Sequence, residues 1–116
     1  MMRSCTPAEV PALQQSGLKV IDVRTEEEFA GGRPSGAVLV TAFAQGAGGM
    51  EPVPDFAQKV EAIAPDKSAP LIVSCRSGAR SARAIAMLEA VGYTDCINLD
   101  GGFMAWAADP SLPTEK

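Results

Sequence analysis

Cys75 stands where a cysteine is suited to act as a nucleophile. It follows an apolar run, 71–74, and opens the segment 75–81 (CRSGARS), behind which a helical pattern begins. The amides of such a loop and the positive end of a helix dipole both favour negative charge. Arg76 and Arg80 add positive charge nearby, so we expect the thiol pKa to lie below its usual value. The segment therefore predicts an activated thiolate in an anion-binding loop.

A buried cysteine that merely ends a strand is the competing interpretation, since small apolar cysteines are common in protein cores. The residues behind Cys75 argue against it. A core cysteine requires neither the Ser77-Gly78 turn nor a pair of arginines. We therefore treat Cys75 as the candidate catalytic residue.

The absence of histidine limits the chemistry that Cys75 can take part in. It excludes a Cys-His dyad, a Ser-His-Asp triad and a histidine-ligated metal. The three cysteines, Cys5, Cys75 and Cys96, are too widely spaced for a zinc motif. We expect no metal or cofactor, and activation of the thiol by amides, a helix dipole and arginines.

Length and composition predict a single domain over residues 1–116, with 47% hydrophobic residues available for its core. The net charge of −4 and the lack of a Lys/Arg run argue against nucleic acid and anionic membrane surfaces as partners. No stretch approaches the roughly 20 apolar residues of a membrane span. The first residues lack the apolar core of a signal peptide, so we expect a cytoplasmic protein, or an organellar one if a leader was removed.

Helix and strand patterns alternate along the chain. Capping boxes at Thr6–Glu9 and Thr25–Glu28 predict a helix over 10–15 and a short helix that Gly31 and Gly32 end. Further helices are expected over 55–64, 81–91 and 102–108, strands over 19–23, 37–41, 71–75 and 96–99, and a loop over 42–54.

This alternation is typical of a parallel sheet with helices on both faces. Sites in such sheets lie beyond the carboxyl ends of the strands. Asp22, Cys75 and Asp100 all lie at the carboxyl ends of predicted strands. We therefore expect them to converge at one edge of the sheet.

Five segments in order make the chain resemble the rhodanese (thiosulfate sulfurtransferase) homology domain. They are Val20–Arg24, Glu28-Phe29 with Gly36-Ala37, Cys75–Ser81, Gly92-Tyr93, and Asn98–Gly102 with Trp106. Together they span about residues 18–108. The resemblance implies an α/β fold with a central, mainly parallel five-stranded sheet and helices on both faces, whose first strand would fall near residues 3–5.

The resemblance also implies a sulfurtransferase. Its Cys75 thiolate would take the outer sulfur of thiosulfate, or of another small anionic or persulfide donor, and release sulfite. The persulfide on Cys75 would then pass this sulfur to cyanide, to a thiol or to a thioredoxin-like acceptor. No cofactor is needed for either step.

The residue roles that follow are expectations for this sequence. Cys75 is catalytic, and Arg76 meets the anionic donor. Arg80 points inward to a carboxylate, Asp22 or Glu28, and thereby holds the shape of the loop. The substrate-binding loop comprises Arg76, Ser77, Gly78, Ala79, Arg80 and Ser81, and its support comprises Asp22, Arg24 and Glu28.

Other residues are assigned outside this machinery. Trp106 and Cys96 are expected in the core. Arg33 stands where the family usually has a histidine, and the neighbouring Pro34 is shifted by one position, which puts the local loop in question. A role for Cys5 as a resolving thiol, and for Arg33 in the anion field, stays open.

Two other functions are compatible with the fold. Arsenate reductase or phosphatase chemistry uses a wider loop, typically with five residues between cysteine and arginine, whereas four separate Cys75 from Arg80 here. A sulfur carrier or regulatory binding module is the other alternative, against which the presence of the cysteine argues. The physiological donor and acceptor are not determined by these residues.

Overall fold

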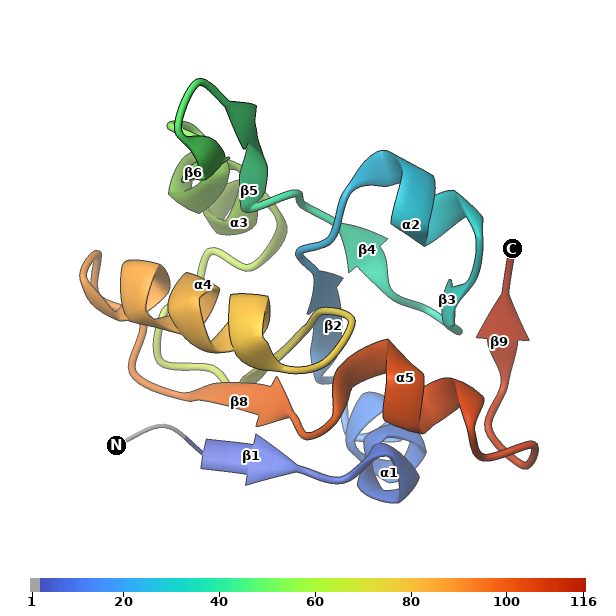
Figure 1. The fold of residues 1–116 in the computed structure, drawn as a ribbon. Helices are drawn as coiled ribbons and strands as arrows, with labels where there is room; N and C mark the ends of the chain where they lie inside the picture. Colours follow the sequence, from blue (N-terminus) through green and yellow to red (C-terminus); the bar gives the residue numbers. More distant parts are fainter. Residues whose placement is uncertain (1–2) are drawn as a thin grey trace.

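A five-stranded parallel sheet forms the centre of the computed structural model, which describes residues 3–116 (Figure 1). Its strands lie in the order β1-β8-β7-β2-β4. They are β1 (Arg3–Cys5), β2 (Lys19–Asp22), β4 (Val38–Leu39), β7 (Leu71–Ser74) and β8 (Cys96–Leu99). Every pairing is parallel, so the carboxyl ends of all five strands meet at one edge. The predicted fold class is confirmed.

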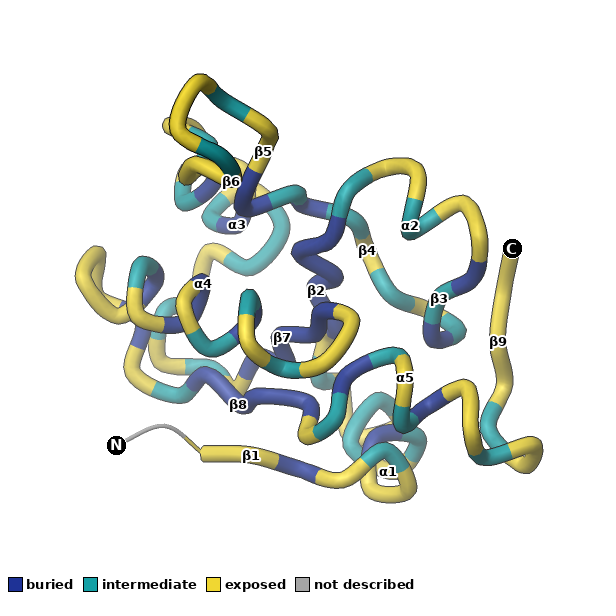
Figure 2. The backbone as a smooth tube through the Cα atoms, in the orientation of Figure 1, coloured by how far each residue is buried: buried dark blue, intermediate teal, exposed yellow. Residues whose placement is uncertain are grey.

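Helices cover both faces of this sheet. One core packs Phe56, Val60 and Leu88 from α3 and α4 against Ile21 and Val73. The opposite core packs Val10 and Trp106, from α1 and α5, against Val20 and Ile72. Adjacent residues of one strand thus face opposite cores; β7 and β8 are buried throughout, and β2 is buried from Val20 onward (Figure 2). The helices are η1 (Pro7–Glu9), α1 (Val10–Gln15), α2 (Glu26–Ala30), α3 (Phe56–Ile63), α4 (Ala79–Glu89) and α5 (Gly102–Ala107).

Local signals placed most of these elements. Both capping boxes form: the backbone N–H of Thr6 donates to Glu9 Oε1 at 2.8 Å, and that of Thr25 donates to Glu28 Oε1 at 3.2 Å. The last strand of the sheet matches its predicted range, 96–99. The strand expected over 37–41 is shorter, because ladder pairing with β2 is confined to Val38 and Leu39. Trp106 and Cys96 lie in the core as predicted.

The prediction of a loop over 42–54 is wrong. This segment forms an antiparallel hairpin of β5 (Phe43–Gly46) and β6 (Gly49–Pro52), which projects from the sheet (Figure 1). Gly49 supplies a positive φ of 109° at the turn, and Phe43 at the base of the hairpin is buried. The glycines that indicated a loop are the residues that permit the tight turn.

Two further differences concern short segments. The helix expected from residue 81 begins at Ala79, because Gly78, at φ 105°, turns the chain directly into α4. Near the C-terminus, β9 (Thr114–Glu115) pairs antiparallel with β3 (Arg33–Pro34), a ladder that no sequence pattern indicated. Within residues 3–116, no helix is both long and apolar enough to span a bilayer.

Candidate active site

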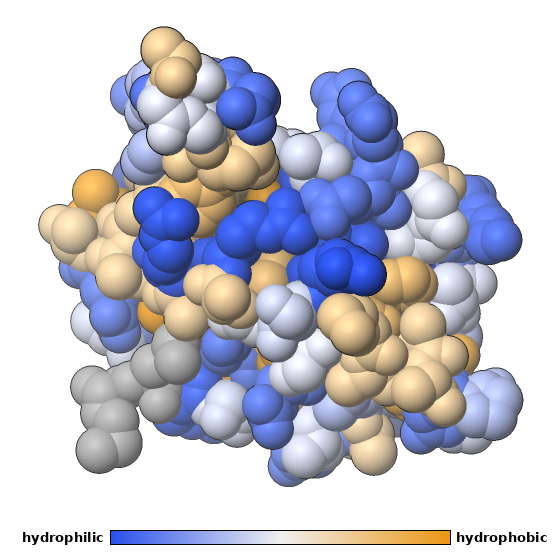
Figure 3. All heavy atoms as spheres, viewed as in Figure 1, coloured by the Kyte–Doolittle hydropathy of each residue, from blue (hydrophilic) through white to orange (hydrophobic). Residues whose placement is uncertain are grey.

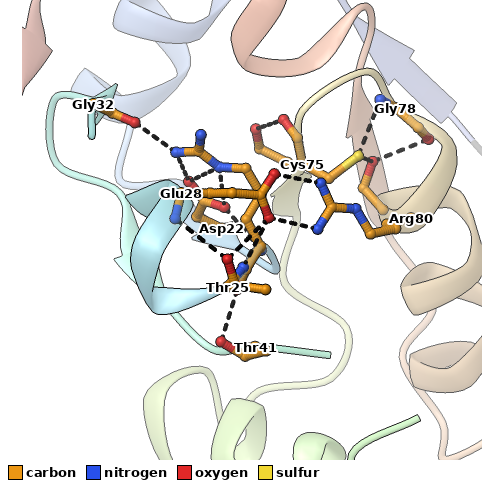
Figure 4. A network of polar contacts seen from close by, with 11 residues as sticks. Asp22, Thr25, Glu28, Gly32, Thr41, Cys75, Gly78 and Arg80 are labelled. Carbon is orange, nitrogen blue, oxygen red and sulfur yellow. Dashed lines mark hydrogen bonds and ion pairs between the residues drawn. The ribbon is translucent and has the colours of Figure 1, made fainter. Parts of the chain in front are cut away.

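Cys75 directly follows β7 at the edge where the parallel strands end (Figure 4). Asp22 closes the neighbouring strand β2, and Asn98 lies near the end of β8 on the other side. The sheet thus brings together side chains more than fifty residues apart in sequence. Cys75 has no exposed surface, so an external reactant reaches its sulfur only when the surrounding groups move.

Hydrogen bonds from the loop and from α4 converge on the sulfur. The backbone N–H of Gly78 donates to Cys75 Sγ at 3.0 Å, and the Ser81 hydroxyl lies 3.4 Å from it. Burial alone would raise the pKa of the Cys75 thiol. Hydrogen bonds from the Ser81 hydroxyl and from the amides of Ser81, Gly78 and Ser77 outweigh burial and leave this pKa below its usual value.

Hydrogen bonds to the sulfur are the causes that lower the pKa of Cys75, and, after hydrogen bonding with Glu28, the Coulombic attraction between Cys75 and Arg80 contributes to the raised pKa of Arg80. Of the two carboxylates considered for Arg80, Asp22 and Glu28, its guanidinium forms a bidentate pair with Glu28, at 2.7 and 2.8 Å. Its charge is thereby largely compensated by a carboxylate.

Gly102 explains how the loop presents its amides to the sulfur. At the start of α5, the N–H of Phe103 donates to the Cys75 carbonyl at 2.8 Å, and that of Met104 donates to the Arg76 carbonyl at 3.0 Å. A Cβ on Gly102 would lie 2.5 Å from the Cys75 oxygen, and its φ is 56°. Only glycine allows this close approach, which turns the loop carbonyls toward α5 and away from Sγ.

The loop residues differ in their exposure. Arg76, Ser77 and Ala79 are exposed, Gly78 and Arg80 are half-buried, and Ser81 is buried. Ala79, Arg80 and Ser81 belong to the first turn of α4 and not to the loop itself. Figure 3 shows hydrophilic surface over this end of α4 and over α2.

Asp22 and Arg24 form a buried ion pair behind the site. The Arg24 guanidinium donates to both oxygens of Asp22, at 2.8–3.1 Å, and to the carbonyl of Gly32 at 2.7 Å. It also lies 4.7 Å from the centre of the Phe103 ring. The pair therefore joins the end of β2, the segment after α2 and helix α5, whose amides hold the Cys75 loop.

Arg33 and Arg83 each stack on an aromatic ring. The Arg33 guanidinium lies 4.4 Å from the Phe29 ring centre, and it donates to the Phe29 carbonyl. Arg83 lies 4.4 Å from the ring of Phe43, at the base of the hairpin. Both contacts are cation–π interactions. They place Arg33 against α2 and Arg83 against β5.

Cys5 and Cys96 form no disulfide, and both are buried. Burial raises the pKa of each thiol to about 11. The environment of Cys75 thus differs from that of both other cysteines. Gly102 and Asn98 contribute to the site through close approach of the backbone and through hydrogen bonds, roles that the sequence motif containing them does not indicate.

The pairing of Glu28 with Arg80 predicts a specific pH dependence of stability. Hydrogen bonding to Arg80 lowers the pKa of Glu28 from 4.5 to about 2. Because the folded state holds this carboxylate ionised, its stabilising contribution is present above about pH 4.5 and is lost as pH falls toward 2. We expect the unfolding free energy of the wild type to fall more steeply over that interval than that of Glu28→Gln.

Urea unfolding at a series of pH values measures this difference. Glu27→Gln is the matched control, since it neutralises an exposed carboxylate on the same helix. Its profile should follow the wild type. A Glu28→Gln profile parallel to that of the wild type would show that the Arg80 pair does not contribute.

Comparisons with known proteins point to one family. A model described as Rhodanese-like domain matches residues 6–109. Thiosulfate sulfurtransferase 16, chloroplastic, of Arabidopsis thaliana is 40% identical over 100 residues, which cover 86% of this chain and 82% of that protein. Thiosulfate sulfurtransferase GlpE of Pseudomonas fluorescens (strain SBW25) is 34% identical over 100 residues, covering 86% of this chain and 80% of that protein.

A solved structure shares the fold. The crystal structure of a thiosulfate sulfurtransferase from Pseudomonas aeruginosa aligns with a TM-score of 0.78 at 21% identity. The alignment covers 98% of this chain but 20% of that chain. At this identity, the likeness shows the architecture alone.

Proposed function

Because this chain belongs to the rhodanese-like domain family, we propose that it is a sulfurtransferase that carries a sulfane sulfur as a persulfide on Cys75. Thiosulfate or another persulfide-type anion is the donor. Cyanide, a small thiol or a thioredoxin-like protein is the acceptor. The observation that carries the proposal is the Cys75 sulfur, held at 3.0 Å from the Gly78 amide with its pKa below the usual range.

The reaction consists of two displacements at sulfur. In the first, the Cys75 thiolate attacks the outer sulfur of thiosulfate. A new S–S bond forms, the S–S bond of thiosulfate breaks, and sulfite leaves with the electron pair. In the second, an acceptor thiolate or cyanide attacks the outer sulfur of the persulfide, and the Cys75 thiolate is regenerated. Both steps require a sulfur that leaves and attacks as an anion, which a lowered thiol pKa favours.

The loop has the donors that such an anion needs. Amides of Ser77, Gly78 and Ser81 and the Ser81 hydroxyl surround the position of the sulfur charge. Contacts of Gly102 and α5 with the Cys75 and Arg76 carbonyls hold the peptide of the Ser77 amide, and the Gly78 and Ser81 amides belong to the start of α4. The backbone donors are therefore oriented before reaction, so they reorganise little during charge transfer. Arg76, exposed beside the thiol, is the residue that we assign to the anionic donor.

Phosphate or arsenate chemistry has less support. An oxyanion of that kind calls for an arginine that is free to form a bidentate contact with the substrate. The Arg80 guanidinium is already engaged with both oxygens of Glu28. This contact agrees better with a role for Arg80 in holding α4 against α2, while the loop binds a single sulfur atom and not an oxyanion.

Intact mass spectrometry tests the proposed persulfide directly. After incubation with thiosulfate and removal of excess donor, the wild type should gain about 32 Da, one sulfur atom, as expected for a covalent intermediate on a nucleophilic cysteine. Cys75→Ser should gain nothing. An equal gain in both proteins would place the sulfur elsewhere. If neither protein gains mass, thiosulfate is rejected as the donor. The same experiment is then repeated with small persulfide donors and, to test the sulfur-carrier alternative, with a persulfidated protein.

Arg76→Ala should chiefly weaken binding of the anionic donor. We expect the KM for thiosulfate to rise about three- to tenfold with kcat little changed, because an exposed charge contributes about 1 kcal/mol. Steady-state thiocyanate formation at low ionic strength measures both constants. Arg83→Ala is the matched control, since it removes an exposed arginine of α4 that stacks on Phe43. Equal effects of the two substitutions would indicate general charge and not a donor contact.

A further inference from the structure

The hydroxyl of Ser81 lies between two acceptors that compete for its one proton. Its oxygen is 3.4 Å from Cys75 Sγ and forms a short hydrogen bond with Asn98 Oδ1. The Gly78 carbonyl lies 3.1 Å from the same oxygen, but it already accepts from the Ala82 amide and from Asn98 Nδ2. The choice of the hydroxyl is therefore between sulfur and Asn98.

The orientation of Asn98 is set by its neighbours. Its Nδ2 donates to the Gly78 carbonyl at 3.2 Å, and a carbonyl can only accept. Oδ1 must then face Ser81. Among residues 3–116, the Ser81 hydroxyl is the donor that the structure gives this oxygen, and Asn98 is itself buried, with 8% of its surface exposed. Losing the Ser81 proton would leave a buried acceptor unpaired.

We propose that Asn98 is a positioning residue for the nucleophile, which holds the Ser81 hydroxyl while Cys75 is a thiol and yields it to the sulfur when the thiol proton leaves. In the thiol state, S–H donates to Ser81 Oγ and the Ser81 hydroxyl donates to Asn98. In the thiolate state, the thiol proton has passed to water and the Ser81 hydroxyl donates to sulfur. Asn98 thus sets the pH at which Cys75 becomes a nucleophile, an assignment that rests on the proposed function of Cys75.

Several charged groups surround this network and stay constant in the test. They are Asp22 of β2, Arg76 of the loop, Arg80 and Arg83 of α4, Glu28 of α2 and Asp100 beyond β8. Helix α5 contributes no ionisable side chain. Changing Asn98 to an uncharged residue alters none of these charges, so a shift in thiol ionisation reports on the hydrogen bonds.

Asn98→Leu tests the proposal through the pH midpoint of Cys75 alkylation. If Asn98 merely supported the loop, its loss would raise this midpoint, whereas the proposal expects it to fall. Without Oδ1, the Ser81 hydroxyl is free for the thiolate, and the midpoint of the pH profile for Cys75 alkylation should move down by about one unit. Ser81→Ala should move it up. In the Ser81→Ala background, Asn98→Leu should have no further effect, because Asn98 acts through Ser81.

Alkylation by iodoacetamide, followed peptide by peptide in the mass spectrometer, gives the profile. Cys75→Ser serves as the blank, and Cys5 and Cys96 are resolved by their own peptides. An upward or absent shift in Asn98→Leu overturns the proposal, as does an equal shift in the Ser81→Ala background. No sulfur donor is present, so failure here is distinct from failure of the thiosulfate experiment.

A measurement on the wild type covers the case in which Asn98→Leu fails to fold. The side-chain amide resonances of Asn98 should change with pH at the midpoint for Cys75, since its Ser81 partner leaves at that point. In Ser81→Ala this change should shrink to the small effect of a nearby charge. The proposal is overturned if the Asn98 amide resonances of the wild type do not change at this midpoint. It is also overturned if they change equally in Ser81→Ala.

Discussion

Cys75→Ser is expected to lose sulfur transfer almost completely, by roughly a thousandfold or more, while remaining folded. Serine keeps the shape of the side chain and can accept the hydrogen bond from the Gly78 amide. Its hydroxyl, however, ionises far above neutral pH and cannot form a persulfide. Thiocyanate formation from thiosulfate and cyanide measures the loss, and circular dichroism with urea unfolding measures the fold.

Cys5→Ser is the matched control for this substitution. Cys5 is also a buried cysteine, but it lies in β1 and its thiol pKa is raised to about 11. The control should retain transfer and show at most a loss of stability. Substantial transfer by Cys75→Ser would exclude the persulfide mechanism proposed for this residue.

Arg24→Met should cause the largest loss of stability. It leaves the Asp22 carboxylate, which has no exposed surface, without its ionic partner. Removing one member of a buried pair typically costs about 3–5 kcal/mol, because the remaining charge stays desolvated. Here the Gly32 carbonyl and the Phe103 ring also lose their contacts with the guanidinium. The midpoint of urea unfolding measures the change.

The same substitution at an exposed pair provides the comparison. Arg3 pairs with Asp95 at the surface, where its side chain is 61% exposed, so Arg3→Met should change stability by less than about 1 kcal/mol. The double variant Asp22→Leu/Arg24→Met should recover part of the loss, since it leaves no buried charge. Equal effects of Arg24→Met and Arg3→Met would contradict the proposed importance of the buried pair.

Sequence patterns were most informative where the determining contacts are local. The capping boxes at Thr6–Glu9 and Thr25–Glu28 depend on groups three residues apart, and three of the four residues of the strand over 96–99 are apolar. The hairpin over 43–52 was missed for the converse reason. Its glycines are equally compatible with a flexible loop, and the burial of Phe43 that anchors it arises from packing with distant elements.

The sequence by itself determined the candidate nucleophile and its immediate surroundings, because Cys75, the turn at Gly78 and the helix behind them are contiguous. It also placed the ends of β2, β7 and β8 at one edge, since parallel strands share their direction. Tertiary structure alone decided which groups meet there. Arg80 pairs with Glu28, 52 residues away, and Asn98 reaches Ser81 from β8. Such choices depend on the distances between packed elements, which no spacing along the chain encodes.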